Sequence, residues 1–326
     1  MTDAPRRTHT PNVKAPSARH ARDDKPRLSV VVTIVDGVSA LQACLRALEA
    51  QEDAPNLEVL VPFDDSVRPP ARLTQEHPRV RFVDLGVLKT DRPHDHPAGQ
   101  HELFDRRRSA GLNAATGEIV AMLEDRGVPR RDWAHEVAEA HRHPDAVIGG
   151  AVENGVDSWL NWAVYFCDFG RYQLPFDAKS SSYATDVNVS YKWKVLDQTR
   201  ALWQDRYHET TLHWALQRGG VRLFLSPRIV VDQVRTDLRV GSLLGERWHW
   251  GRLFAYTRVR EVGKLKQWLL AGLTPVLPFV LWLRLLRLQI DRGRTLGRFL
   301  RLSPVVIVLL VAWSIGEAVG YGTRRP

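Results

Sequence analysis

The sequence predicts an α/β fold built on a doubly wound, mostly parallel sheet with helices on both faces. Two observations carry this prediction. Residues 28–35 form a near-continuous β-branched run, which is typical of a strand covered by helices on both faces. Leu41, Cys44, Leu45 and Leu48 then recur at helical spacing. Predicted strands and helices continue to alternate along the chain, and this alternation favours a parallel sheet.

Further elements are predicted from short apolar runs and from helical periodicity. Parallel strands place their carboxyl ends at one edge of the sheet, where ligands of such folds collect. The polar stretch 86–101, which contains Pro and His, is expected to be a loop. Strands are expected over residues 57–61, 79–83, 119–123, 185–191 and 221–225, and helices over 106–115, 133–141 and 212–217.

Charge is distributed unevenly along the 326 residues, and the distribution argues against nucleic-acid binding. The formal net charge is +9, but residues 28–246 carry 25 basic against 31 acidic side chains. The basic excess lies mainly in residues 1–27, 247–266 and 284–301, and the last two stretches flank apolar segments. Such clusters fit anionic lipid head groups, so no nucleic-acid partner is expected. The two cysteines lie far apart without metal-type spacing, which fits a reduced, cytosolic compartment.

The predicted organisation has a folded domain over residues 28–240, preceded by a disordered basic arm at 1–27. The arm has no apolar h-region, so no cleavable signal peptide is expected. A basic and aromatic linker at 241–266 is predicted to lie at a membrane interface. It leads to two apolar membrane segments within 267–322, and a short tail follows at 323–326.

The two apolar segments differ in length and in helix-breaking residues. The second, 302–322, is long enough to cross a hydrocarbon core of about 30 Å. The first, 267–283, is marginal in length, and its two prolines suit a kinked or re-entrant segment. The connection 284–301 alternates Arg with Leu and is predicted to be an amphipathic helix on the cytosolic side. The alternative is a soluble helical hairpin with an apolar seam, because Glu317 would need a partner in lipid.

Carboxylates follow two of the predicted strands. Residues 64–66, Asp-Asp-Ser, come after the strand at 57–61, and residues 124–126, Glu-Asp-Arg, come directly after the strand at 119–123. Carboxylate oxygens are good ligands for Mg²⁺ and Mn²⁺, so acidic side chains at this edge can hold a divalent cation against a diphosphate. A self-capping turn is the alternative explanation of residues 64–66.

Taken in order, these motifs resemble the family 2 glycosyltransferases of the GT-A fold, which are inverting enzymes with nucleotide-sugar donors. The resemblance covers residues 28–240 and implies a GT-A-like sheet, a nucleotide-sugar partner and a divalent cation, Mg²⁺ or Mn²⁺. Thr33 and Asp36, in the turn after the first strand, would then lie against the nucleotide base. Asp64, or Asp65 beside it, would accept hydrogen bonds from uracil or ribose.

Two further segments resemble donor-site motifs of that family. Residues 108–113, Arg-Ser-Ala-Gly-Leu-Asn, resemble its Ala-Arg-Asn-x-Gly segment, which would turn Arg108 toward the base or the phosphates. Residues 185–191 resemble its Gly-x-Asn-x-Ser-Tyr strand, so Asn188 would bond hydroxyls of the donor or acceptor. Each residue also has a plain structural explanation, as part of a solvated basic face for Arg108 and as an ordinary strand residue for Asn188.

The metal motif departs from the family pattern. Glu124, Asp125 and Arg126 occupy the place of its Asp-x-Asp, and Arg cannot ligate a cation. Pro129 and residues 132–133, Asp-Trp, match the pattern downstream and secure this alignment. Two interpretations stay open. In the first, Glu124 and Asp125 hold the cation, and Arg126 adds positive charge near the diphosphate. In the second, the cation is bound weakly or is absent, and Arg126 partly replaces it.

The catalytic base implied by the resemblance is Glu209. His208 and Glu209 fall where the family has Glu-Asp before a helix, and the second carboxylate of that pair takes the proton of the acceptor hydroxyl. A carboxylate in a partly desolvated cleft, with a raised pKa, suits that task. His208 would orient Glu209 or substitute for it. The alternative is a Glu that favours the helix dipole at an N-terminus.

Together these features predict a membrane-associated, inverting glycosyltransferase with its catalytic domain on the cytoplasmic side of the membrane. It would transfer a sugar from a nucleotide donor to an acceptor hydroxyl, and the membrane segments favour a lipid or lipid-linked acceptor. The altered motifs at 124–126 and 208–209 motivate an alternative, a degenerate fold that binds a nucleotide-sugar or a partner without turnover. A nucleotidyltransferase is disfavoured, because no Gly-rich phosphate loop with a following Lys lies near the first strand.

Overall fold

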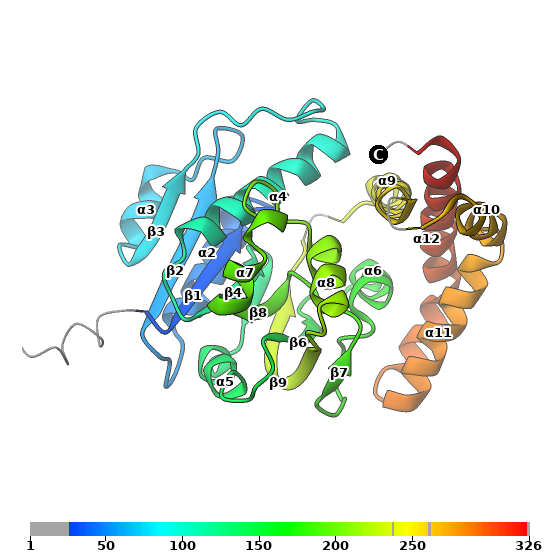
Figure 1. The fold of residues 1–326 in the computed structure, drawn as a ribbon. Helices are drawn as coiled ribbons and strands as arrows, with labels where there is room; N and C mark the ends of the chain where they lie inside the picture. The colour runs from blue at the N-terminus through cyan, green and yellow to red at the C-terminus, as the bar shows by residue number, and fades with distance from the viewer. Residues whose placement is uncertain (1–25, 237, 260–261, 325–326) are drawn as a thin grey trace, which may run out of the picture.

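A mixed sheet forms the centre of the molecule (Figure 1). The computed structural model describes residues 26–236, 238–259 and 262–324. Among these residues the strand order is β3-β2-β1-β4-β8-β6-β9-β5, and β7 also pairs with β9. The strands are β1 (Leu28–Thr33), β2 (Leu57–Phe63), β3 (Val80–Asp84), β4 (Ile119–Glu124), β5 (Gly127–Pro129), β6 (Val147–Asn154), β7 (Lys179–Ser181), β8 (Asn188–Lys192) and β9 (Leu223–Gln233).

The first four strands bring their carboxyl ends to one edge of the sheet. β1 runs parallel to both β2 and β4, and β2 runs parallel to β3. Thr33, the last residue of β1, pairs with Glu124, the last residue of β4. The second half is mixed, because β8 runs antiparallel to β4 and β6, while β6 and β9 run parallel to each other. The loops that follow β1 and β4 therefore meet at the same place.

Helices cover both faces of the sheet. Successive residues of a strand point to opposite faces. Val30 of β1 accordingly belongs to a core cluster with residues of α2 and α5, and Val31 belongs to a second cluster with residues of α4, α7 and α8. The helices are α2 (Val38–Glu49), α3 (Ala71–Glu76), α4 (Pro97–Ala114), α5 (Trp133–Ala140), α6 (Trp159–Phe169), α7 (Trp193–Gln198), η1 (Arg200–Leu202), α8 (Glu209–Arg218), α9 (Val240–Val259), α10 (Lys264–Leu273), α11 (Leu277–Arg292) and α12 (Leu296–Thr323).

The predicted α/β fold is confirmed, and the predicted strands fall on β1, β2, β3, β4, β8 and β9. The helix expected at 106–115 is longer than predicted: α4 begins at Pro97, so the loop predicted over 86–101 ends earlier. His96 caps this helix by accepting a hydrogen bond from the backbone N–H of Ala98. Hydrophobic periodicity does not reveal α4, because the helix buries several charged side chains instead of a simple apolar stripe.

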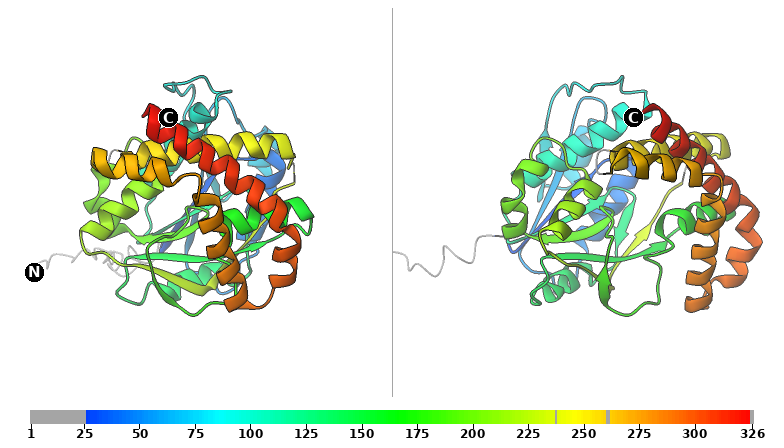
Figure 2. Two further views of the ribbon diagram at one scale, coloured as in Figure 1. Left: turned by 90° about the vertical axis from the view of Figure 1, so that its right-hand side faces the viewer. Right: turned by 45° about the vertical axis from the view of Figure 1, so that its right-hand side comes forward.

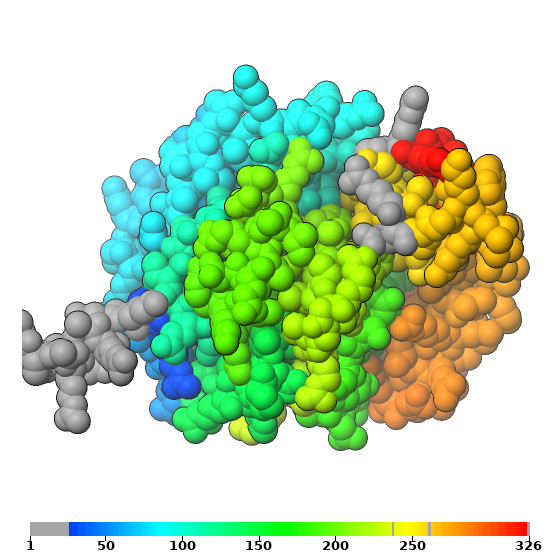
Figure 3. Space-filling model, viewed as in Figure 1, coloured from blue at the N-terminus to red at the C-terminus, as the bar shows by residue number. Residues whose placement is uncertain are grey.

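The C-terminal helices α9 to α12 pack together on one side of the domain (Figures 1 and 2). The backbones of α9 and α12 cross at close range, since a side chain at Gly316 would meet the carbonyl oxygen of Trp248. α12 also packs on α6 through a cluster that includes Phe166, Phe299 and Leu309. The space-filling view shows the yellow and orange surfaces of this region as one continuous block beside the domain (Figure 3).

Among the described residues, α12 is the one helix that is long and apolar enough by itself to cross a membrane. Its Glu317 is buried and accepts a hydrogen bond from Nε1 of Trp313 at 2.9 Å, so the carboxyl group has a partner within the helix. The predicted segment 267–283 falls on α10 and α11, which together form an apolar pair bent by 75°. The bend agrees with the kink expected from its prolines.

The prediction of one amphipathic helix over 284–301 is wrong. α11 ends at Arg292, and α12 begins at Leu296 after a short turn. Polar contacts tie this turn to the domain: the hydroxyl of Thr295 donates to the side-chain oxygen of Gln289, and the amide of Gln289 donates to Gln173. Gln289 is fully buried, so the residues that looked like an interfacial helix in the sequence instead join two antiparallel helices.

Candidate active site

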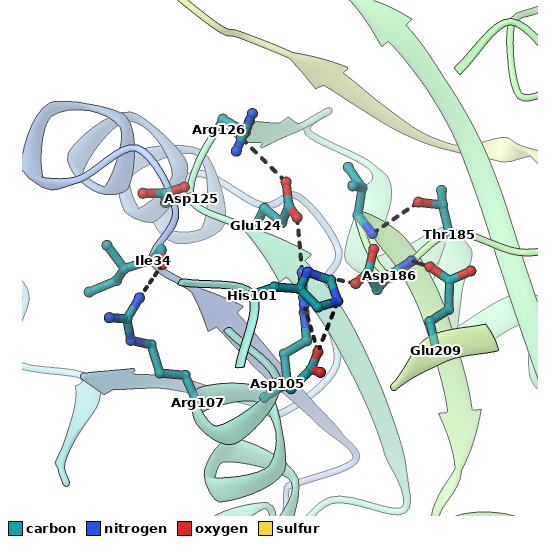
Figure 4. Close-up of polar contacts among 12 residues, drawn as sticks. Ile34, His101, Asp105, Arg107, Glu124, Asp125, Arg126, Thr185, Asp186 and Glu209 are labelled. Carbon is teal, nitrogen blue, oxygen red and sulfur yellow. Dashed lines mark hydrogen bonds and ion pairs between the residues drawn. The ribbon is translucent and has the colours of Figure 1, made fainter. Parts of the chain in front are cut away.

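A cavity of about 690 Å³ lies between the carboxyl edge of the sheet and the C-terminal helices. One end is polar and is drawn in Figure 4. The other end is formed by side chains of α6, α9, α11 and α12, which are mostly apolar but include Arg247, Arg258, Arg284 and Glu317. The polar end is lined by His101, Asp105, Arg108, Glu124, Arg126, Asp186, His208 and Glu209.

Glu124, which ends β4, is held between two arginines. Its Oε1 accepts a hydrogen bond from Nη2 of Arg108 at 3.0 Å, and its Oε2 lies 3.3 Å from Nε of Arg126. The same Nη2 of Arg108 lies 2.8 Å from Oδ2 of Asp186, in the segment before β8. The side chain of Arg108 is only 4% exposed. This buried network therefore joins α4, β4 and the segment before β8.

Glu209 completes the polar end from α8. Its Oε2 accepts a hydrogen bond from the backbone N–H of Asp186 at 3.0 Å. Burial raises the pKa of Glu209 well above its ordinary value, and the negative charge of Asp186 raises it further. Nδ1 of His213 lies 3.9 Å from Oε1 of Glu209. A carboxylate with a raised pKa binds a proton more readily near neutral pH than an exposed one does.

His208 is the N-cap of α8 and lines the cavity beside Glu209. Its Nδ1 accepts a hydrogen bond from the backbone N–H of Thr211 at 3.4 Å. Burial lowers the pKa of His208, which favours a neutral ring. On its other side lies Asp105, whose pKa burial raises to about 7. The hydrogen bond at the start of α8 thus fixes the orientation of the His208 ring. The sequence alone indicates only that His208 is next to Glu209.

The structure places Asp125 and Thr33 outside the lining of the cavity. Both residues are fully buried. Oδ2 of Asp125 accepts hydrogen bonds from the backbone N–H groups of Asp36 at 2.9 Å and Gly37 at 2.8 Å. Gly37 has a φ of 103°, which favours glycine and lets the turn after β1 wrap around the carboxylate. Asp125 therefore holds this turn, whereas the carboxylate of Asp36 lies 3.5 Å from Nη2 of Arg126.

Asp64 forms a buried ion pair with Arg107, a residue that sequence reasoning missed. Nε of Arg107 donates to Oδ2 of Asp64 at 2.6 Å, and Nη1 donates to the carbonyl oxygen of Ile34 at 2.8 Å. Both side chains are 1% exposed. Burial alone would raise the pKa of Asp64, but the hydrogen bond from Arg107 helps to lower it. Asp65, by contrast, is 46% exposed and pairs with Arg68 at the surface.

Asn188 lies in the core, where its side chain bonds to three different elements. Its Oδ1 accepts a hydrogen bond from Nε1 of Trp133 at 3.0 Å. Its Nδ2 donates to the carbonyl oxygens of Ala151 at 2.8 Å and Ile229 at 3.1 Å. The amide is buried and joins α5 to β6 and β9, so its hydrogen bonds serve the packing of the sheet.

Comparisons with known proteins identify the family. The sequence profile of glycosyl transferase family 2 matches residues 29–200, just over half of the chain. The chain belongs to glycosyl transferase family 2. A comparison with curated proteins finds no match.

Solved structures of glycosyltransferases resemble this chain. The mannosyltransferase PcManGT from Pyrobaculum calidifontis, in complex with GDP-Man and Mn²⁺, has a TM-score of 0.55 and 16% identity, over 90% of this chain and 86% of that chain. Residues 1–349 of S. aureus TarS, in complex with UDP-GlcNAc, have a TM-score of 0.46 and 12% identity, over 89% of this chain and 90% of that chain. The predicted GT-A fold and nucleotide-sugar glycosyl transfer are confirmed.

The acidic groups of this family 2 glycosyltransferase do not fit a divalent cation. Among the described residues, no group of three or more His, Cys, Asp and Glu side chains is arranged to hold a metal ion. Arg108 and Arg126 engage the two oxygens of Glu124, and backbone amides engage Asp125. A cation beside Glu124 would therefore lie next to two guanidinium groups, and like charges repel. The donor set does not suit Mg²⁺ or Mn²⁺, the cations implied by the sequence.

We predict that Asp64→Asn destabilises the fold far more than Asp65→Asn. Loss of the buried carboxylate would leave Arg107 unpaired and lower the free energy of unfolding by about 3 kcal/mol, whereas Asp65→Asn would leave it nearly unchanged. Chemical denaturation measures both. Because the pKa of Asp64 is lowered in the folded chain, its contribution is present above the ordinary pKa of a carboxyl and disappears as the pH falls. Equal losses from the two substitutions would contradict the buried pair.

Proposed function

We propose that this family 2 glycosyltransferase inverts the anomeric centre, with Glu209 as the general base. The observation that carries the proposal is the placement of Glu209 across one cavity from Glu124 and Arg126. In an inverting transfer the base takes the proton of the acceptor hydroxyl as its oxygen attacks the anomeric carbon. The bond from that carbon to the diphosphate breaks on the opposite face. The raised pKa of Glu209 suits this proton transfer.

The donor site comprises the ends of β1, β2 and β4 and the inner side of α4. Arg108 and Arg126 lie nearest to the cavity and would face the donor phosphates. Asp36 contributes through its contact with Arg126. Asp64 is a positioning residue, because its carboxylate fixes Arg107 and through it the end of β1. His208 would help to shape the acceptor side of the cavity, where its fixed ring lies beside Glu209.

The acceptor is an amphipathic molecule, a lipid or a lipid-linked saccharide. The cavity that holds the polar groups continues between the C-terminal helices, where most of the lining side chains are apolar. An acceptor with a hydroxyl group and a hydrocarbon chain would match this cavity, with its hydroxyl in the polar end and its chain between the C-terminal helices. The apolar walls are formed by residues that include Phe254, Leu277, Leu281, Leu285, Leu288, Leu309, Leu310 and Trp313.

The protein associates with the membrane through the outer side of α10, α11 and α12, with the catalytic domain on the cytoplasmic side. Exposed apolar patches of this extent mark protein or membrane contacts. Six arginines between 284 and 301 favour the cytoplasmic leaflet, which carries anionic lipids. The exposed apolar side chains, termed here the outer face, are Leu265, Trp268, Leu269, Leu273, Phe279, Leu283, Ile290, Leu300, Ile307, Val308, Val311 and Ile315.

The division of the chain follows from this assignment. The catalytic domain is assigned to residues 28–240, and the start of α9 at Val240 supports that boundary. Residues 241–266 serve as the linker at the membrane interface, and 267–322 as the membrane-associated part. The predicted basic arm lies almost entirely outside the described residues, and the tail at 323–326 lies partly outside them.

We predict that Glu209→Gln abolishes transfer without abolishing donor binding. The donor is first identified by a thermal-shift screen of UDP-, GDP-, dTDP- and CMP-sugars. Removal of the base should lower kcat on the order of 10²–10⁴-fold, with little change in the Kd of that donor. The exposed Asp205→Asn is the matched control and should keep full activity. In the parent enzyme, kcat/KM should rise with pH, because only the deprotonated carboxylate accepts the proton.

Two results would contradict Glu209 as the base. One is a Glu209→Gln enzyme with unchanged kcat and an unchanged pH profile. The other is a parent protein that binds the donor but neither transfers nor hydrolyses it, which would favour the alternative function of binding without turnover.

The acceptor assignment predicts different outcomes for two neighbouring leucines of α11. Leu281 lines the cavity, whereas Leu283 is on the outer face. A Leu281→Trp substitution should fill the apolar end and raise the KM for a polyprenyl- or acyl-linked acceptor on the order of tenfold, while the donor KM stays unchanged. Leu283→Trp should leave both constants near those of the parent. Equal acceptor constants in all three proteins would rule out this end of the cavity as the chain-binding region.

The outer face predicts binding to lipid vesicles. Full-length protein should float with phosphatidylcholine–phosphatidylglycerol vesicles and should remain bound in high salt, because apolar burial is not screened. The double substitution Trp268→Ser with Leu269→Ser should reduce the floated fraction several-fold. Leu202→Ser, at an exposed apolar residue of η1, is the control. Parent protein that stays at the bottom of the gradient would contradict membrane association.

A further inference from the structure

Arg126 lines the cavity with a guanidinium whose hydrogen bonding is incomplete. Its side chain is 9% exposed, yet Nε has no hydrogen-bond partner among the described residues. Its guanidinium lies near the carboxylates of Glu124 and Asp36 only at ion-pair distances of 3.3 and 3.5 Å. Among the described residues, Nε of Arg247 is also buried without a hydrogen-bond partner, but both of its Nη atoms donate to the carboxylate of Asp168. A buried guanidinium with unmet donors is costly unless a ligand completes its bonding.

The guanidinium of Arg126 is positioned for an anionic ligand. The residue follows the end of β4, lines the polar end of the cavity and lies beside Glu124 (Figure 4). Arg108 is its counterpart on the other side of Glu124, and Nε of Arg108 is likewise buried without a hydrogen-bond partner among the described residues. Two guanidinium groups thus flank one carboxylate at the edge where the donor diphosphate would lie.

The carboxylates around these arginines are arranged to hold guanidinium groups. Asp186 and Glu124 both contact Nη2 of Arg108. The carboxylate of Asp125, the remaining acidic side chain next to Arg126 in the sequence, is bonded to two backbone amides. The carboxylate oxygens that a divalent cation would need as ligands therefore already interact with guanidinium groups or with backbone N–H groups.

We propose that Arg126, together with Arg108, binds the diphosphate of the donor in place of a divalent cation. This inference rests on the proposed function. As the bond from the anomeric carbon to the diphosphate oxygen breaks, its electron pair and negative charge pass to that oxygen. The N–H groups of Arg126 donate hydrogen bonds to the departing phosphate, and Glu209 takes the proton of the acceptor hydroxyl. Planar guanidinium groups suit such contacts with phosphate oxygens.

Binding of nucleoside diphosphates without metal tests the proposal directly. The full chain in detergent, freed of metal with EDTA, is titrated calorimetrically with UDP, GDP and dTDP, and the tightest ligand is used further. Its Kd should change less than about threefold when 5 mM Mn²⁺ replaces EDTA. A loss of binding in EDTA of tenfold or more, restored by Mn²⁺, would overturn the proposal. This comparison needs no variant, so a folding defect cannot obscure it.

Substitutions at residue 126 separate the two ways of holding the phosphates. Arg126→Gln should weaken the nucleoside diphosphate about tenfold or more and affect the corresponding nucleoside much less. Arg126→Asp, which restores a carboxylate at the third motif position, should gain affinity when Mn²⁺ is added, unlike the parent. Arg130→Gln, at an exposed arginine that pairs with Asp232, is the matched control. Unchanged diphosphate affinity in Arg126→Gln would overturn the proposal.

Failure of this inference and failure of the proposed function give different results. If the protein transfers sugar only with Mn²⁺ and does not bind the nucleoside diphosphate in EDTA, the proposed function stands and the proposed role of Arg126 is refuted. If the protein binds the nucleoside diphosphate through Arg126 in EDTA but transfers no sugar to any acceptor, the proposed role of Arg126 stands and the proposed function is refuted.

Discussion

The guanidinium of Arg108 is the contact on which the rest of the site depends. It extends from α4 and joins the carboxylate that ends β4 to the carboxylate of Asp186, whose backbone N–H in turn holds Glu209. A buried cation is tolerated only where opposite charges surround it, so few arrangements of these elements satisfy it. The planar fork of arginine can serve two carboxylates at once. The pairing that stabilises the sheet edge therefore also sets the spacing between Glu124 and Glu209.

The strands and the residues at their ends could be predicted, because β-branched runs mark buried strands and parallel strands share one edge. Glu124 lines the cavity for that reason, whereas Glu209 reaches the same cavity from the start of α8. Side-chain direction could not be predicted. The arginines at 106–108 are equivalent in the sequence, and only the packing of α4 sends Arg107 toward the ends of β1 and β2. Asn188 stands at a motif position, yet hydrogen bonds to three surrounding elements place its amide in the core.

The C-terminal helices complete the cavity as well as forming the outer face. α12 lies against α6 of the domain and against α9, so the apolar end of the cavity is part of the folded unit. Under the proposed function, membrane attachment and acceptor binding would depend on the same helices: their inner side chains line the cavity, and their outer side chains would face lipid. An acceptor embedded in the bilayer would then enter from the apolar end and reach Glu209 with its hydroxyl first.

A structure of the enzyme with its nucleotide-sugar donor, determined in the presence of EDTA, tests the central claim most directly. The account predicts that the diphosphate lies within hydrogen-bond distance of Arg126, with Arg108 still joined to Glu124 and Asp186. It also predicts that the carboxylate of Glu209 lies across the anomeric carbon from the leaving phosphate. A donor bound away from this edge of the sheet, or a sugar on the far side of Arg108 from Glu209, would contradict it.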